Sequence, residues 1–130
     1  MKILLVDDEY ELVSTLAERL SIRGIDADWA TSGKDALAKL AETNYDLAVL
    51  DIKMPKLSGL ELRKQIQTIQ PNMRYIFMTG HGSAEDFFSA SSEEGADAYL
   101  VKPVNIDDLI TKIHESLARQ ALGASGPIEQ

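Results

Sequence analysis

Ile3-Leu4-Leu5-Val6-Asp7-Asp8 is the stretch that decides the fold, because four apolar residues in a row end in two carboxylates. Apolar runs of the same length recur, each followed by a polar side chain: Leu47–Leu50 by Asp51, Tyr75–Met78 by Thr79, and Ala98–Val101 by Lys102. A short, continuous apolar run is typical of a strand that is buried on both faces of a parallel sheet. The pattern therefore predicts strands over residues 2–6, 46–50, 74–78 and 97–101.

Segments with helical periodicity separate these runs. Apolar residues recur every three or four positions in residues 12–20, 36–40, 60–69 and 106–117, as on the buried face of a helix. Residues 25–30 alternate apolar and acidic side chains and predict a half-exposed strand at a sheet edge. Strand and helix thus alternate five times. This alternation predicts an α/β fold, a doubly wound five-stranded parallel sheet with helices on both faces.

Serine residues mark the predicted helix starts. Ser32 and Ser58 each precede a helical segment, and Glu61 follows Ser58 at the spacing of a capping box. Ser83 can cap one further helix over residues 83–93, whose other serines compete with the helix backbone for hydrogen bonds. We expect this weak helix to move most if the domain has two states.

The composition indicates one domain and argues against several functions. The chain has 130 residues, no cysteine and 45% hydrophobic residues, enough for a core without disulfides. Its formal charge of −8 argues against direct nucleic-acid binding by this domain, which depends on Lys and Arg neutralising phosphates. The sequence contains neither an apolar run of membrane-spanning length nor a signal peptide. We therefore expect a cytoplasmic protein.

The polar residues that end the strands form a candidate site. In a parallel sheet the carboxyl ends of the strands converge on one edge, where such folds bind ligands. Asp7, Asp8 and Asp51 would then repel one another unless a cation or a proton neutralises them. Mg²⁺ prefers oxygen ligands, so the three acids are a candidate metal site. The plainer interpretation of Asp7 and Asp8 is that they open the first helix, where acids favour the helix dipole.

Asp51 is the candidate nucleophile, because a carboxylate can accept a phosphoryl group to form an aspartyl phosphate. Pro103 holds Lys102 extended at a strand end, and both a cis and a trans peptide bond are compatible with the sequence. Each of these residues alone also fits a plain surface loop, and Thr79 by itself is uninformative. Their occurrence together at several strand ends favours Mg²⁺-assisted phosphoryl transfer to Asp51.

These motifs resemble those of the receiver domain of two-component response regulators. The matching residues are Leu5-Val6-Asp7-Asp8-Glu9, Asp51 with Met54-Pro55 and Gly59, Met78-Thr79-Gly80, Tyr99, and Lys102-Pro103. The resemblance covers residues 1–120 as a receiver domain and leaves residues 121–130 as a C-terminal tail or linker. It implies a flavodoxin-like sheet with the strand order 2-1-3-4-5, which is known from receiver proteins and puts residues 25–30 at the edge.

The resemblance also implies a role for each residue at the acidic cluster. Asp51 would be the phospho-acceptor, Asp8 would bind Mg²⁺ directly, and Asp7 would bind it mainly through water. Lys53 would offer its backbone carbonyl to the same ion. Lys102 would pair first with the Asp51 carboxylate and then with the phosphoryl group.

Two further residues would carry the signal. Thr79 would hydrogen-bond a phosphoryl oxygen, and Tyr99 would be an aromatic switch that turns inward when Thr79 moves. Phosphorylation would thereby change the face formed by residues 83–120. On this face Phe87 or Phe88 would join a partner surface.

The implied partners are a sensor histidine kinase or a histidine phosphotransfer protein as the phosphoryl donor, and an output domain or effector protein downstream. Phosphorylation could also drive homodimerisation through the 83–120 face. The domain would be a bacterial signalling module and not an enzyme, because it assists only the phosphorylation and dephosphorylation of its own Asp51.

Three other functions share parts of this pattern. A haloacid-dehalogenase-type phosphatase also uses an aspartate nucleophile and Mg²⁺, but it needs a second aspartate two residues later, where this chain has Lys53. A pseudo-receiver would be an interaction module without phosphorylation, and the acidic pair with Asp51 and Lys102 argues against it without excluding it. A flavodoxin-like cofactor binder would need a phosphate-binding loop after the first strand, which the sequence lacks.

Overall fold

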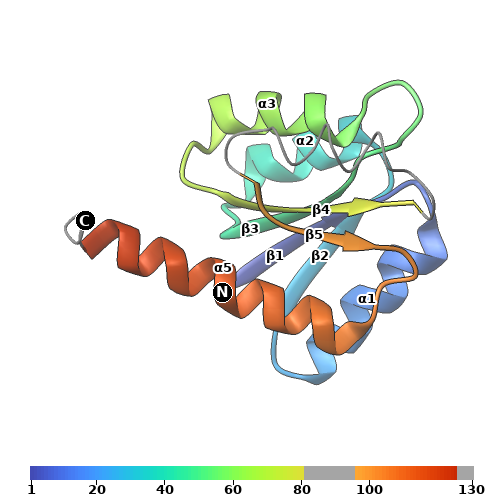
Figure 1. The fold of residues 1–130 in the computed structure, drawn as a ribbon. Helices are drawn as coiled ribbons and strands as arrows, with labels where there is room; N and C mark the ends of the chain where they lie inside the picture. The colour runs from blue at the N-terminus through green and yellow to red at the C-terminus, as the bar shows by residue number, and fades with distance from the viewer. Residues whose placement is uncertain (81–95, 126–130) are drawn as a thin grey trace.

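A sheet of five parallel strands forms the centre of the protein in the computed structural model, which describes residues 1–80 and 96–125 (Figure 1). The strands are β1 (Lys2–Val6), β2 (Asp26–Ala30), β3 (Leu47–Asp51), β4 (Arg74–Thr79) and β5 (Ala96–Val101). Their order in the sheet is β2-β1-β3-β4-β5, and each neighbouring pair is parallel. The predicted fold class and strand order are confirmed.

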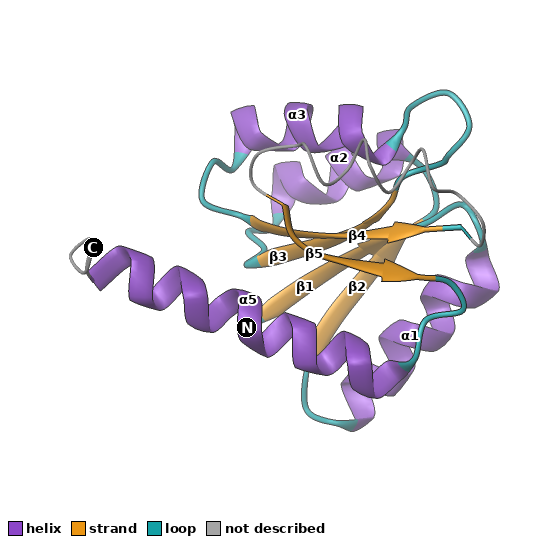
Figure 2. Ribbon diagram, in the orientation of Figure 1, coloured by secondary structure: helices purple, strands orange, loops and turns teal. Residues whose placement is uncertain are grey.

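The helices cover both faces of this sheet (Figure 2). Those in the described part of the chain are α1 (Tyr10–Ile22), α2 (Gly33–Glu42), α3 (Gly59–Ile69) and α5 (Ile106–Ser125). α2 and α3 lie side by side on one face, whereas α1 and α5 lie on the other. The predicted helix over residues 83–93, with Phe87 and Phe88, lies outside the described residues.

α5 contains 20 residues and runs past residue 120, where we predict the receiver domain to end. The division between residues 1–120 and the tail therefore falls inside a helix and stays a prediction. Leu109 and Ile113 of α5 are fully buried against the sheet, as the apolar periodicity predicts. Within residues 1–80 and 96–125, every helix is too short or too polar to be a membrane span.

Burial on both faces explains why the central strands are apolar along their whole length. In β1, Ile3 and Leu5 face the core under α1 and α5, whereas Leu4 and Val6 face the core under α2 and α3. All four side chains are fully buried, and the same alternation runs through β3 and β4. A slip of one residue would exchange the two sets of side chains, so the two cores determine the strand register.

β2 lies at the edge of the sheet, as the alternating sequence predicts, and pairs with β1. Its acidic side chains have polar partners. Asp26 accepts a hydrogen bond from Lys2 Nζ at 2.9 Å, and Asp28 accepts one from the Tyr45 hydroxyl at 2.6 Å. Charged side chains on a short edge strand disfavour pairing with another chain.

Ser32 and Ser58 cap α2 and α3, as predicted. Each serine hydroxyl accepts a hydrogen bond from the backbone N–H three residues later, at 3.0 Å for Ser32 and 3.2 Å for Ser58. A glycine follows each cap as the first helical residue, Gly33 in α2 and Gly59 in α3. The two helices therefore begin with the same local sequence.

Gly59 is required because α3 begins directly against the end of β3. A Cβ atom at this position would clash with the Asp51 carbonyl oxygen and lie 2.9 Å from the Asp51 carbonyl carbon. The Gly59 N–H donates a hydrogen bond to the Ile52 carbonyl at 3.0 Å, which holds the two backbones together. The start of α3 thus positions the strand end that carries Asp51.

Gly59→Ala should lower the free energy of unfolding by about 2–3 kcal/mol, because the new methyl group meets backbone atoms that cannot move aside. Gly33→Ala is the matched control at the same helical position. Its methyl group would lie 2.6 Å from Leu57 Cδ2, the end of a flexible side chain. Denaturant unfolding should show a clearly smaller loss for Gly33→Ala, and equal losses would contradict the backbone explanation.

Candidate functional site

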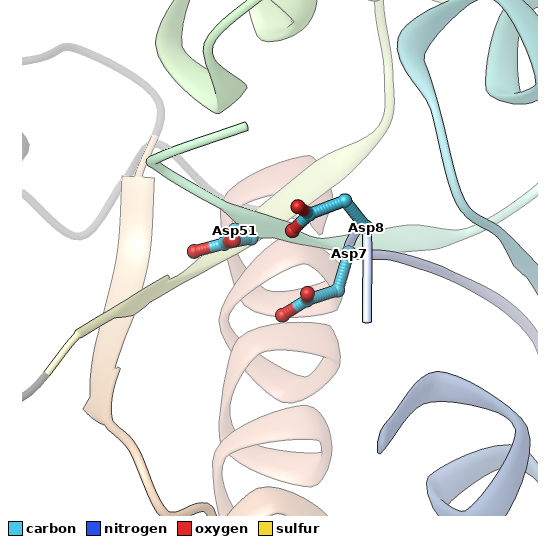
Figure 3. A group of neighbouring side chains, drawn as sticks. All are labelled: Asp7, Asp8 and Asp51. Carbon is cyan, nitrogen blue, oxygen red and sulfur yellow. The ribbon is translucent and has the colours of Figure 1, made fainter. Parts of the chain in front are cut away.

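Four strand ends meet at one edge of the sheet and bring the predicted site residues together. Asp51 and Thr79 are the last residues of β3 and β4, while Asp7 and Lys102 directly follow β1 and β5. Figure 3 shows the side chains of Asp7, Asp8 and Asp51 as close neighbours at this end of the sheet. One oxygen atom from each of these three carboxylates lies within 4.8 Å of the other two.

The three carboxylates differ in their exposure to solvent. Asp7 is fully buried and Asp51 is 3% exposed, whereas Asp8 is exposed. Asp7 Oδ1 accepts a hydrogen bond from the Glu9 backbone N–H at 2.9 Å, which orients the Asp7 carboxylate just before α1. Two buried acids thus form the floor of the site, and one exposed acid lies at its rim.

Lys102 brings a positive charge to this floor. Its Nζ atom lies 2.6 Å from Asp7 Oδ2 and 3.4 Å from Asp51 Oδ2. A third carboxylate oxygen, Glu9 Oε1, lies 3.1 Å from the same ammonium. The Lys102 backbone N–H donates a hydrogen bond to the Thr79 carbonyl at 2.9 Å, and the peptide bond that follows Lys102 is cis. The ammonium therefore neutralises part of the charge of the two buried acids.

Burial and repulsion favour protonation of the buried acids. Burial raises the pKa of Asp51 to about 6, and the charge of Asp7 adds to this effect while Lys102 opposes it. Burial also raises the pKa of Asp7, despite its contact with Lys102. For Lys102, burial is the largest single influence and acts to lower the pKa, but the contacts with Asp7 and Glu9 and the charge of Asp51 together outweigh it, so the pKa is raised. One ammonium compensates the buried carboxylates only in part.

The acidic cluster has the chemistry of a magnesium site. Mg²⁺ binds hard oxygen ligands at about 2.1 Å, so the oxygen atoms on one ion are about 3–4 Å apart. One oxygen atom from each of Asp7, Asp8 and Asp51 lies within 4.8 Å of the other two, which is close to this spacing. The raised pKa values of the two buried acids indicate that additional positive charge would stabilise their ionised forms. The three residues therefore fit the ion, either directly or through water.

The other predicted site residues surround this cluster. The Lys53 backbone donates a hydrogen bond to the Asp51 carboxylate. Thr79 is almost completely buried, and Tyr99 on β5 is half-buried, with its ring stacked on Phe77 at 6.2 Å between centroids. The roles expected for the Lys53 carbonyl, Thr79 and Tyr99 stay predictions.

Glu9 is a site residue that the sequence pattern did not reveal. Its carboxylate accepts a hydrogen bond from Lys102, which is 93 positions away in the chain. Glu9 belongs to the acidic motif after β1, but an acid at this position is equally typical of a helix start. Asp8 and Glu9 are both exposed, but in the folded protein the carboxylate that forms an ion pair with Lys102 is that of Glu9.

Comparisons with known proteins point to one family. The family model of the response regulator receiver domain matches residues 3–114. The transcriptional regulatory protein CpxR homolog of Haemophilus influenzae is 41% identical over 120 residues, which cover 92% of this chain and 52% of that protein. Sporulation initiation phosphotransferase F of Bacillus subtilis is 36% identical over 108 residues, which cover 83% of this chain and 86% of that protein. The chain thus spans about half the length of the first relative and most of the second.

A solved structure has the same fold. The crystal structure of a CheY-like response regulator receiver domain protein from Methanospirillum hungatei matches with a TM-score of 0.81 at 37% identity. The match covers 92% of this chain and 95% of that chain. The likeness therefore extends over nearly the whole length of both chains.

Asp51→Asn should stabilise the protein at pH 7.5 in EDTA, because it removes one of two buried negative charges and keeps the shape of the side chain. The rise of the Asp51 pKa from 3.8 to about 6 corresponds to a gain of about 1–3 kcal/mol in unfolding free energy. Denaturant unfolding measures this gain. Glu18→Gln is the control, since it removes a charge from an exposed position on α1 and should change stability by less than about 0.5 kcal/mol.

The gain from Asp51→Asn should also depend on pH. Between about pH 6 and pH 4 the folded protein binds a proton at Asp51 before the unfolded chain does, so the wild type gains stability as the pH falls. The difference between the wild type and Asp51→Asn should therefore be constant well above pH 6 and shrink as the pH falls through 6 toward 4. A difference that stays unchanged across this range would show that burial of the Asp51 charge is not its cause.

Proposed function

The chain belongs to the response regulator receiver domain family of two-component systems, and from this premise we propose that it is a phosphorylation-dependent switch. In this proposal Asp51 accepts a phosphoryl group with the help of Mg²⁺, and the resulting change is passed to a downstream partner. The observation that supports it most is the surrounding of Asp51, a buried carboxylate beside two further carboxylates and the ammonium of Lys102.

Asp51 acts as the nucleophile in the proposed transfer. An Asp51 carboxylate oxygen forms a new P–O bond while the P–N bond of a donor phosphohistidine breaks. The leaving imidazole nitrogen keeps the bonding electron pair and takes up a proton from solvent. Lys102 lies 3.4 Å from Asp51 Oδ2, so its charge favours the ionised nucleophile and can then pair with a phosphoryl oxygen.

The remaining acids and one backbone oxygen form the proposed metal site. Asp7, Asp8 and Asp51, together with the Lys53 carbonyl, would hold Mg²⁺, Asp8 directly and Asp7 mainly through water. When bound, Mg²⁺ supplies positive charge that offsets the charge of the phosphoryl oxygens. The partial compensation of the buried acids by Lys102 supports this assignment, because a site with unbalanced negative charge favours a divalent cation.

Thr79 and Tyr99 are the residues proposed to carry the change away from Asp51. Asp51 pairs with Met78 across the sheet, so Thr79 is one residue further along β4. Phe77, which like Thr79 belongs to β4, pairs with Tyr99 of the neighbouring strand β5, and the rings of Phe77 and Tyr99 are stacked. A movement of Thr79 toward a phosphoryl group would therefore act on the strand that packs against Tyr99.

The partners of the switch follow from its family. The proposed donor is a sensor histidine kinase or a histidine phosphotransfer protein, in the cytoplasm. The proposed recipient is an output domain or an effector protein, since a transcriptional regulatory protein matches this chain over only 52% of its own length. The formal charge of −8 argues against direct DNA contacts by the receiver itself. Homodimerisation on phosphorylation is a further proposed output.

Incubation with Mg²⁺ and a small acyl phosphate should add one phosphoryl group to the wild-type protein, because Asp51, the metal site and Lys102 need no kinase for the chemical step. Intact mass spectrometry measures the addition. Asp51→Ala should remain unmodified, and EDTA should prevent the modification of the wild type. If no mass is added and no Asp51-dependent release of inorganic phosphate occurs, the proposal fails and a phosphorylation-independent interaction module becomes the better hypothesis.

A further inference from the structure

Lys102 contacts acids that are proposed to hold Mg²⁺. Its ammonium lies 2.6 Å from Asp7 and 3.4 Å from Asp51, and both of these carboxylates belong to the cluster that fits the ion. A divalent cation bound to the same carboxylates would repel the ammonium at close range. Binding of Mg²⁺ and the contact of Lys102 with the buried acids therefore compete with each other.

Glu9 is placed where it can receive the displaced ammonium. Its Oε1 atom already lies 3.1 Å from Lys102 Nζ. The Glu9 side chain is 63% exposed, in contrast to the fully buried side chain of Asp7, so it lies on the solvent side of Lys102. Glu9 is also absent from the group of carboxylates that converge on one point. Its carboxylate is thus next to the ammonium but outside the candidate metal site.

The local structure of α1 favours this use of Glu9. Glu9 occupies the N-cap position of α1, where Ser, Asp or Asn would cap the helix best, and its side chain makes no capping hydrogen bond. The longer glutamate side chain extends to Lys102 instead. α1 therefore begins without a side-chain cap, and the carboxylate at its N-cap position binds Lys102 instead.

We propose that Glu9 is a positioning residue for Lys102. Glu9 holds the Lys102 ammonium on the solvent side of the site while Mg²⁺ is bound to the acids. This contact strengthens Mg²⁺ binding and slows phosphoryl transfer. The transfer is slowed because Lys102 has to leave Glu9 in order to pair with a phosphoryl group on Asp51, and because the charge of Glu9 repels the incoming phosphoryl oxygens. This inference rests on the proposed function of Asp51.

A double-mutant cycle separates this role from a general effect of negative charge. Titration calorimetry with Mg²⁺ on the full chain compares the wild type, Glu9→Gln, Lys102→Met and the double variant. Glu9→Gln should weaken Mg²⁺ binding about two- to fivefold, as expected for an ion pair with one exposed partner. In the Lys102→Met background, Glu9→Gln should have almost no effect.

Glu11→Gln is the matched control, because Glu11 is an exposed acid in the first turn of α1, two residues further along the chain. It should change Mg²⁺ affinity less than Glu9→Gln does. The same weakening by Glu9→Gln with and without Lys102, or equal effects of Glu9→Gln and Glu11→Gln, would overturn the proposal. Glu9→Gln keeps the side-chain length at an exposed position, and denaturant unfolding checks that the variant is folded.

The rate of modification by the acyl phosphate at saturating Mg²⁺ is the second measurement. Glu9→Gln should raise this rate about twofold or more while Mg²⁺ affinity falls. A fall in both affinity and rate would indicate damage to the site and would overturn the proposal. If no variant is modified at all, the proposed function of Asp51 fails, and the Mg²⁺ titrations still decide whether Glu9 acts through Lys102.

Discussion

Repulsion between buried carboxylates at one end of the sheet is the constraint on which the rest of the structure depends. Asp7 and Asp51 are buried because the strands that lead to them are covered by helices on both faces. Their charges are compensated in part by Lys102, which directly follows β5 at the edge of the sheet, two strands away from β3. The two apolar cores bury the acids, and the strand order and the length of the lysine side chain bring the opposite charge to them.

Much of the fold could be predicted from the sequence because burial on both faces leaves a strong signal in short apolar runs. The ends of elements were less predictable. β3 and β4 each include one polar residue beyond the apolar run, Asp51 and Thr79, since strand pairing depends on backbone hydrogen bonds and not on apolar side chains. α5 likewise continues to Ser125, beyond the last apolar position of its predicted pattern.

The gathering of Asp7, Asp8, Asp51, Thr79 and Lys102 could also be predicted, since the carboxyl ends of parallel strands converge in any such sheet. The features that sequence did not reveal depend on how the loops place backbone and side chains in three dimensions. The ion pair of Glu9 with Lys102 joins residues from opposite ends of the chain. The contact that excludes a side chain at position 59 is with the backbone of Asp51 and Ile52, and no periodic pattern in the sequence indicates it.

The ammonium that contacts both buried acids is supplied by the end of the last strand of the sheet. When the chain is synthesised from its N-terminus, β1, β3 and β4 leave the ribosome before Lys102 does. Until β5 pairs with β4, the sheet would have to bury Asp7 and Asp51 without this counter-charge. Completion of the sheet and partial neutralisation of the two acids are therefore one event, so a nascent chain brings this counter-charge to the site only after β5 has been made and paired.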